Sequence, residues 1–200
     1  MEEQLLFNQD SILKQVVAPM EVPSFVSTNQ VFHDVISCII EQQIHYRSSK
    51  KIFANALIRS GIAYVTPENF HLLELHGISN LKMAMNKYET LLRFVEYWSN
   101  QSKDFFALTD EEVIKELSSI KGIGQWTIDM VLLYTLKRPN IFPVDDFHLK
   151  QVMIYLYQLD PKNKLKSQML QIAEKWGNQK SLAVLYLLEW KKLYKLRAKS

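Results

Sequence analysis

The segment that decides the fold reads Ile120-Lys121-Gly122-Ile123-Gly124-Gln125-Trp126-Thr127. Two glycines separated by one apolar residue permit a very tight turn, because glycine tolerates positive φ and lets another backbone approach closely. The apolar residues that follow, Ile128, Val131 and Leu132, have the spacing of one helix face. The sequence therefore predicts a hairpin turn that opens a helix near residues 124–136.

A turn of this kind is suited to holding a phosphate group. The first amides of the following helix have no intrahelical partner, and together with the helix dipole they favour an anion. Lys121 adds a positive charge beside the turn. Contacts to phosphates read no base edge, so this binding would be independent of nucleic-acid sequence. An ordinary helix connection with a capping glycine also explains the turn, so the turn alone leaves both interpretations open.

Two carboxylates follow the turn, in the segment Pro143-Val144-Asp145-Asp146 at the start of the next predicted helix. A phosphate anchor followed at short range by a carboxylate suggests chemistry on a nucleic acid. The alternative is that both acids only cap the helix, a role in which Asp is common. Asp145 and Asp146 both qualify for the chemical role by position.

The composition describes a globular chain of 200 residues, long enough for one domain or two small lobes sharing a core. The apolar fraction of 48% argues against disorder, and no apolar run is long enough to span a membrane. The start, Met1-Glu2-Glu3-Gln4, lacks the basic and apolar regions of a signal peptide. We therefore expect a soluble intracellular protein with no membrane partner.

The single cysteine, Cys38, bounds the cofactor chemistry. It cannot form an internal disulfide, and it excludes a zinc site or iron–sulfur cluster ligated by several cysteines. We expect no metal and no cofactor. The net charge of +3 is weak support for a nucleic-acid partner, although the C-terminus is basic from Lys191 onward.

Apolar residues recur every three or four positions along most of the chain, which predicts an all-α fold. Thr109 followed by Asp110, Glu111 and Glu112 is typical of a capped helix start. Ser79 is expected to cap the helix that follows it. The predicted helices lie near residues 2–17, 30–43, 47–59, 67–75, 79–99, 110–118, 124–136, 146–157, 163–175 and 179–195.

Several of these segments resemble the helix-hairpin-helix DNA glycosylase superfamily, and in particular its DNA-3-methyladenine glycosylase II type. Residues 120–127 resemble the hairpin of that superfamily, and residues 143–146 resemble its Gly/Pro-rich loop with the catalytic aspartate. Three further segments resemble the alkylated-base branch over a span of roughly residues 30–190: Ile39-Ile40-Glu41-Gln42-Gln43-Ile44, Gly77-Ile78-Ser79-Asn80-Leu81-Lys82 and Lys180-Ser181-Leu182-Ala183-Val184-Leu185-Tyr186-Leu187.

The resemblance implies a two-lobed helical fold with a cleft between the lobes. It implies a single glycosylase domain over residues 1–200, with the hairpin at about 118–132 and the catalytic loop at about 141–147. The implied activity is monofunctional base excision repair, in which an alkylated purine such as 3-methyladenine is flipped out and its N-glycosidic bond is hydrolysed. The implied partner is damaged double-stranded DNA, bound by a monomer in the cytoplasm at a bacterial nucleoid or elsewhere inside a cell. The alternative is a non-catalytic helix-hairpin-helix DNA-binding module.

The resemblance also implies roles for individual residues. Asp146 is the expected catalytic carboxylate, because Phe147 and His148 follow it as in several relatives; Asp145 is then the expected N-cap. Trp126 stands where bifunctional relatives carry a lysine, so no lyase step is expected. Trp126 and Tyr46 are candidates for the base pocket, with Phe25 and Tyr64 as weaker ones. The expected DNA-binding residues are Gln42, Gln43, Lys121, Gly122, Ile123, Gly124, Gln125 and Thr127.

Overall fold

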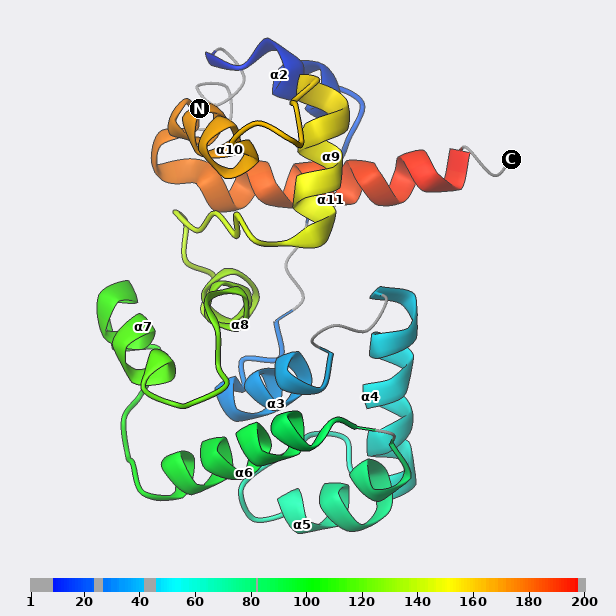
Figure 1. The fold of residues 1–200 in the computed structure, drawn as a ribbon, viewed down its shortest axis with the longest axis vertical. Helices are drawn as coiled ribbons and strands as arrows, with labels where there is room; N and C mark the ends of the chain where they lie inside the picture. Colours follow the sequence, from blue (N-terminus) through cyan, green and yellow to red (C-terminus); the bar gives the residue numbers. More distant parts are fainter. Residues whose placement is uncertain (1–8, 24–26, 42–45, 82, 198–200) are drawn as a thin grey trace. The chain divides into compact units, whose positions relative to one another are not determined.

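The computed structural model describes residues 9–23, 27–41, 46–81 and 83–197, with the backbone alone for residues 46–51, 80 and 194–197 (Figure 1). Every regular element in these ranges is helical, which confirms the all-α prediction. In the same ranges, no helix combines the length and the apolar character that a membrane crossing needs.

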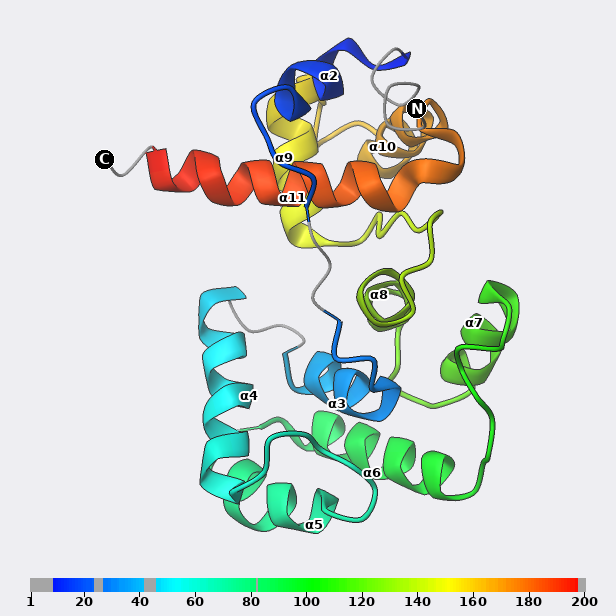
Figure 2. The same ribbon diagram turned by 180° about the vertical axis from the view of Figure 1, so that it is seen from behind.

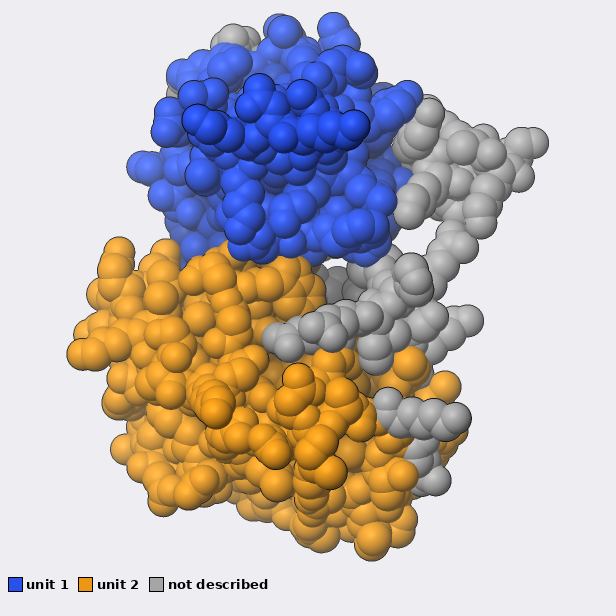
Figure 3. Space-filling view, viewed as in Figure 1, with its two compact units in different colours: residues 1–26, 137–200 blue, residues 27–136 orange. Residues whose placement is uncertain are grey.

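The described residues form two compact units, coloured separately in Figure 3. Unit 1 comprises residues 1–26 and 137–200, and unit 2 comprises residues 27–136. The chain therefore leaves unit 1 after residue 26 and returns to it at residue 137. That the whole chain acts as a single glycosylase domain with a cleft stays a prediction.

Unit 2 is built around α3 (Val31–Glu41), which packs against α4 (Tyr46–Ser60), α6 (Met85–Ser99) and α8 (Gln125–Met130) (Figures 1 and 2). Apolar side chains cover α3 on the sides that face these helices, so that Val35, Ile36, Ile39 and Ile40 are buried. The remaining elements of unit 2 are α5 (Phe70–Leu72), the π-helix η1 (Leu73–Gly77), the 3-10 helix η2 (Ile78–Asn80), α7 (Asp110–Ser118) and the π-helix η3 (Val131–Thr135).

Four aromatic rings extend the core of unit 2 from α3 across α6. Phe32 stacks on Phe94 at a centroid distance of 5.3 Å, and Phe94 contacts Trp98 at 5.6 Å. Trp98 in turn stacks on Phe105 at 5.2 Å. Aromatic pairs at these separations add packing energy to their burial, so they fix α6 and the start of the segment leading to α7.

Unit 1 contains α2 (Ser11–Val17), α9 (Phe147–Tyr157), α10 (Leu165–Glu174), the 3-10 helix η4 (Gly177–Gln179) and α11 (Lys180–Arg197). The long helix α11 packs on α9 and α2 (Figure 1). Asp10 joins these elements: it caps α2 through the amides of Ile12 and Leu13, and it accepts hydrogen bonds from Tyr157 Oη at 2.7 Å and Trp176 Nε1 at 2.9 Å.

A hydrogen-bonded clasp lies where the chain enters and leaves unit 2. Ser27 Oγ donates to the carbonyl oxygen of Thr135 at 3.1 Å. One carboxylate oxygen of Asp34 accepts from Thr28 Oγ1 at 2.7 Å and from Thr135 Oγ1 at 2.6 Å. These bonds hold the first and last residues of unit 2 side by side.

The predicted helix 79–99 begins later than expected, at Met85, and the described residues 79–81, 83 and 84 are not part of it. Ser79 lies in η2 and its Oγ donates back to the carbonyl of Leu75 at 2.5 Å, so the prediction that Ser79 caps α6 was wrong. Leu81 is extended, with φ −94° and ψ 131°, which separates η2 from α6. The predicted helix 124–136 is confirmed as α8 continued by η3.

Candidate functional site

The hairpin lies in unit 2 between α7 and α8. The predicted capped helix start at Thr109 is confirmed, and Thr109 and Glu112 form a capping box at the start of α7, because each side chain accepts from the backbone amide of the other residue. After Ser118 the chain turns through two short backbone bonds, from Ile120 N to Leu117 O at 3.2 Å and from Ile123 N to Ile120 O at 3.0 Å.

The two hairpin glycines differ in what their surroundings allow. Gly122 has φ +104°, a conformation that other residues rarely adopt, and a Cβ atom there would lie 2.0 Å from Thr90 Oγ1. Gly124 is extended, with φ −100° and ψ 170°, and no heavy atom lies within 4 Å of the Cβ position. Gly122 is therefore needed to pack the turn onto α6, whereas Gly124 leaves open space in front of the backbone.

That open space lies at the N-terminus of α8. The first helical hydrogen bonds are those from the amides of Thr127 and Ile128 to the carbonyl of Gly124, at 3.0 and 3.3 Å. The amide of Gln125 precedes these bonds in the first turn, where helices bind anions. The side chains of Lys121 and Gln125 are exposed beside the turn, and Gln125 Nε2 donates to Asp129 Oδ1 at 2.8 Å.

Two of the predicted DNA-binding residues have buried side chains, and their DNA-binding role stays a prediction. Ile123 is 6% exposed and Thr127 has no exposed surface. The amides of both residues donate to backbone carbonyls of the turn. Their burial anchors the hairpin, so the surface open to a phosphate is that of Lys121, Gly122, Gly124 and Gln125.

In unit 1, Asp146 is the N-cap of α9, and the prediction that Asp145 is the cap was wrong. The Asp146 carboxylate accepts a hydrogen bond from Leu149 N at 2.7 Å, and its carbonyl accepts from Lys150 N at 3.0 Å. The reason lies upstream: the Asp146 amide donates to the carbonyl of Pro143 at 2.9 Å, and this turn leaves Asp146 in the extended conformation that a cap requires. Asp146 is only 7% exposed.

Asp145 is held by two lysines. Its carboxylate lies 3.0 Å from Lys150 Nζ on α9 and 2.7 Å from Lys166 Nζ on α10. Hydrogen bonds from Lys166 and Lys150 lower the pKa of Asp145 below its usual value. The two neighbouring aspartates thus differ: Asp145 is the more exposed and is neutralised by cations, whereas Asp146 is buried and oriented by a backbone amide.

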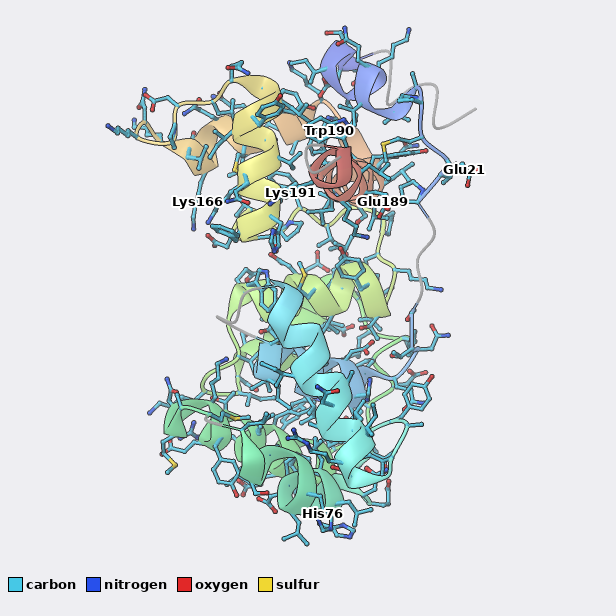
Figure 4. The ribbon with its side chains drawn as sticks, turned by 90° about the vertical axis from the view of Figure 1, so that its right-hand side faces the viewer. Glu21, His76, Lys166, Glu189, Trp190 and Lys191 are labelled. Atoms are coloured by element: carbon cyan, nitrogen blue, oxygen red, sulfur yellow. The ribbon has the colours of Figure 1, made fainter. Side chains whose placement is uncertain are left out.

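The first turn of α9 carries a second group of polar contacts, which the sequence did not indicate. Lys191 on α11, labelled in Figure 4, places its Nζ 2.9 Å from His148 Nδ1 and 2.5 Å from Gln151 Oε1. The same amine lies 5.7 Å from the centroid of the Phe147 ring. Phe147 is 61% exposed although it directly follows the buried Asp146.

The structure describes the remaining predicted site residues in part. Trp126 lies in the first turn of α8 and is half-buried. Tyr46 begins α4, and its side chain is outside the described residues, as are Gln42, Gln43 and Phe25. Tyr64 packs edge-on against His33 at a centroid distance of 5.2 Å. The roles given to Trp126, Tyr46, Gln42 and Gln43 stay predictions.

Comparison with known proteins identifies the family. Residues 36–179 match the family of HhH-GPD superfamily base excision DNA repair proteins. The chain belongs to this superfamily. The matched range contains both the hairpin and Asp146.

Individual members of the superfamily are similar over most of this chain. A proposed DNA-3-methyladenine glycosylase of Bacillus subtilis, YfjP, is 30% identical over 166 residues, which cover 78% of this chain and 58% of that relative. DNA-3-methyladenine glycosylase 1 of Schizosaccharomyces pombe is 27% identical over 81% of this chain and 73% of its own length. This chain thus spans little more than half the length of the Bacillus subtilis relative.

A solved superfamily structure shares the fold. The structure of the Schizosaccharomyces pombe 3-methyladenine DNA glycosylase in complex with abasic DNA is 25% identical to this chain. It matches with a TM-score of 0.76 over 94% of this chain and 95% of that one. The likeness extends over both units.

Proposed function

We propose that this protein is a monofunctional DNA glycosylase that excises alkylated purines such as 3-methyladenine from double-stranded DNA. The observation that carries the proposal is Asp146, a buried carboxylate held at the N-terminus of α9 within the segment that matches the repair superfamily. The names of the relatives support the substrate class, and the complex of one relative with abasic DNA supports the partner.

The chemistry follows from the charge that develops during cleavage. Breaking an N-glycosidic bond leaves positive charge on the sugar, as in glycoside hydrolysis. A carboxylate near C1′ stabilises that charge most in a dry site, and Asp146 is buried. The amide of Leu149 fixes the orientation of its Oδ1, and the helix N-terminus favours the negative charge. The same carboxylate can orient or deprotonate the attacking water.

A single carboxylate suffices because an alkylated purine is already cationic and leaves as a neutral base without a general acid. The base must first rotate out of the duplex, at a cost of roughly a few kcal/mol. An electron-rich ring such as Trp126 attracts a cationic base, and we assign Trp126 to the base pocket on this ground. A lysine in its place would be needed for a lyase step, so we propose hydrolysis alone.

We assign DNA binding to the exposed part of the hairpin. Lys121, Gly122, Gly124 and Gln125 present a cation and backbone to a phosphate without reading a base. Gln42 and Gln43 are proposed to fill the gap left by the flipped base. We further propose that the protein acts as a monomer inside the cell, at the nucleoid of a bacterium, which fits a DNA-repair superfamily.

The experiment that tests this function is mass spectrometry of the bases released from alkylated and from deaminated duplex DNA. We expect release of 3-methyladenine or another alkylated purine by the wild type. Asp146→Asn should keep its affinity for a duplex with an abasic site and lose base release. Binding without release of any base by the wild type would instead indicate a DNA-binding module, and full activity of Asp146→Asn would refute the catalytic role.

A further inference from the structure

A polar hollow of about 410 Å³ lies beside the hairpin, on the side of α6. Within unit 2, it is separate from the open space in front of Gly124, because Gly124 is not among its lining residues. The lining residues are Asn86, Lys87, Glu89, Thr90, Arg93, Lys121 and Gly122.

The wall that α6 contributes is one face of that helix. Asn86, Glu89, Thr90 and Arg93 are spaced by three, four and seven residues from the first, which places them on the same side of the helix. Thr90 Oγ1 donates to the carbonyl of Asn86 at 2.8 Å, and its side chain supports Gly122. The opposite wall is the first half of the hairpin turn.

Arg93 connects the two walls. Its Nη1 donates to the carbonyl oxygen of Lys121 at 3.4 Å, and its Nη2 donates to Glu89 Oε2 at 2.7 Å. These two contacts orient the guanidinium plane toward the turn. A guanidinium has more N–H donors than these bonds use, and its fork geometry suits phosphate oxygens.

The charge of the hollow favours an anion. Three of its side chains are basic, Lys87, Arg93 and Lys121, against the single carboxylate of Glu89. Lys87 is half-buried and its Nζ donates to the carbonyl of Ile40 on α3 at 3.4 Å, which ties its amine to that helix. Arg93 and Lys121 are the cations nearer the solvent.

We propose that this hollow binds a second backbone phosphate of the DNA strand, next to the phosphate held by the hairpin amides, with Arg93 as its main ligand. The proposal rests on the proposed function, because the hairpin must hold the first phosphate. It assigns DNA contacts to α6, a helix outside the hairpin motif. The phosphate would be held by the Arg93 guanidinium and the Lys121 amine, with Asn86 available as a neutral donor.

The test is the salt dependence of binding to a duplex with an abasic site, followed by fluorescence anisotropy. Each lost phosphate contact should make the negative slope of log K against log salt shallower by about 0.9. We expect Arg93→Gln to reduce the steepness of the slope by about that amount and to weaken binding several-fold at low salt. Arg59→Gln makes the same charge change at an exposed position of α4 that does not line the hollow, and it should leave the slope at the wild-type value.

Two measurements separate the possible outcomes. Thermal unfolding of both variants confirms that the fold is kept; if Arg93→Gln unfolds early, Arg93→Lys should keep the slope while losing the fork geometry. Equal slopes for folded Arg93→Gln, for Arg59→Gln and for the wild type would overturn the proposal that the hollow binds a second phosphate. Saturable binding of inorganic phosphate that disappears in Arg93→Gln, with the DNA slope unchanged, would assign the hollow to free phosphate and would also overturn it.

This test is independent of the test of catalysis. Base release by the wild type decides the proposed function whatever the slope of Arg93→Gln. Conversely, a wild type that binds DNA without releasing a base still reports the slope of each variant. The proposal that the hollow binds a phosphate and the proposal that the protein is a glycosylase are therefore tested by different measurements.

Discussion

Thr90 Oγ1 lies 2.0 Å from the position that a Cβ atom on Gly122 would occupy. The contact makes the first hairpin glycine a packing requirement. We predict that Gly122→Ala destabilises the protein by about 3 kcal/mol, since positive φ and overpacking against α6 both oppose the new side chain. Urea unfolding measures the change. A stability equal to that of the wild type would show that α6 can yield to the turn.

Gly124 offers the matched control for that substitution. Its backbone is extended and its Cβ position is open, so Gly124→Val should change the unfolding free energy by less than about 1 kcal/mol. The same side chain would stand in front of the amides at the start of α8. We therefore predict an affinity loss for abasic duplex DNA of at least about tenfold, or ~1.4 kcal/mol. An affinity equal to that of the wild type would show that no DNA phosphate binds at the N-terminus of α8.

The neighbouring aspartates give a paired test of catalysis. Asn caps a helix about as well as Asp, so Asp146→Asn should keep its stability and lose base release by on the order of 100-fold or more. Asp145→Asn removes a carboxylate that contacts Lys150 and Lys166 and should retain most activity. Single-turnover base release on alkylated duplex DNA measures both. The opposite ranking would transfer the catalytic role to Asp145.

Asp10 should be one of the most sensitive positions in unit 1. Its carboxylate accepts from two backbone amides and from the side chains of Tyr157 and Trp176, and it is buried. Asp10→Ala removes the cap of α2 and leaves both side-chain donors unpaired, which should cost about 3 kcal/mol or more. Tyr157→Phe removes one of those bonds and should cost about 1 kcal/mol. Chemical unfolding of both variants checks the order, and equal losses would contradict it.

His33 gives unit 2 a dependence of stability on pH. Its Nδ1 accepts the amide of Val65 at 3.0 Å, and burial lowers the pKa of the ring from its usual 6.5, partly opposed by Asp34. The unfolded chain therefore takes up a proton at a higher pH than the folded one. Stability should fall as the pH drops below about 6.5 and level off once the folded ring is protonated.

Urea unfolding at pH 7.5 and pH 5.5 measures this loss, and His33→Gln is the control. Glutamine cannot be protonated in this range, so the difference between the two pH values should shrink in the variant. An unchanged difference would assign the pH dependence to other groups.

The sequence predicted the structure correctly where the residues that interact are close together in the chain. The capped helix start predicted at Thr109 is confirmed, since its capping partners Thr109 and Glu112 are three positions apart, and the helix has the predicted bounds 110–118. The helices near residues 124–136, 146–157 and 179–195 followed from their apolar period in the same way, whereas the predicted helix 2–17 is interrupted at Asp10, the N-cap of α2, and its first residues lie outside the described ranges. The superfamily, too, followed from short segments, since the hairpin and the aspartate loop are contiguous in the chain.

The sequence-based predictions failed where the local structure depends on a contact with a residue from another segment. Asp145 and Asp146 both qualified by position, but a turn at Pro143 makes Asp146 the cap, while Asp145 is held by Lys166, which is 21 residues away. The apolar period of α6 continues through residues 79–84, yet a backbone bend at Leu81 excludes them from the helix. The pairing of Gly122 with Thr90, and with it the hollow, depends on packing between segments that the period alone does not align.

The clasp between Ser27 and Thr135 gives unit 2 the topology of an inserted module. Its two ends lie within hydrogen-bonding distance of each other, so unit 2 is a continuous segment inserted between the two parts of unit 1. Segments whose ends meet tolerate circular permutation and transfer between host chains. Unit 2 is thus suited to being rejoined through residues 27 and 135 and reopened at an exposed turn, which would let the hairpin be studied apart from Asp146.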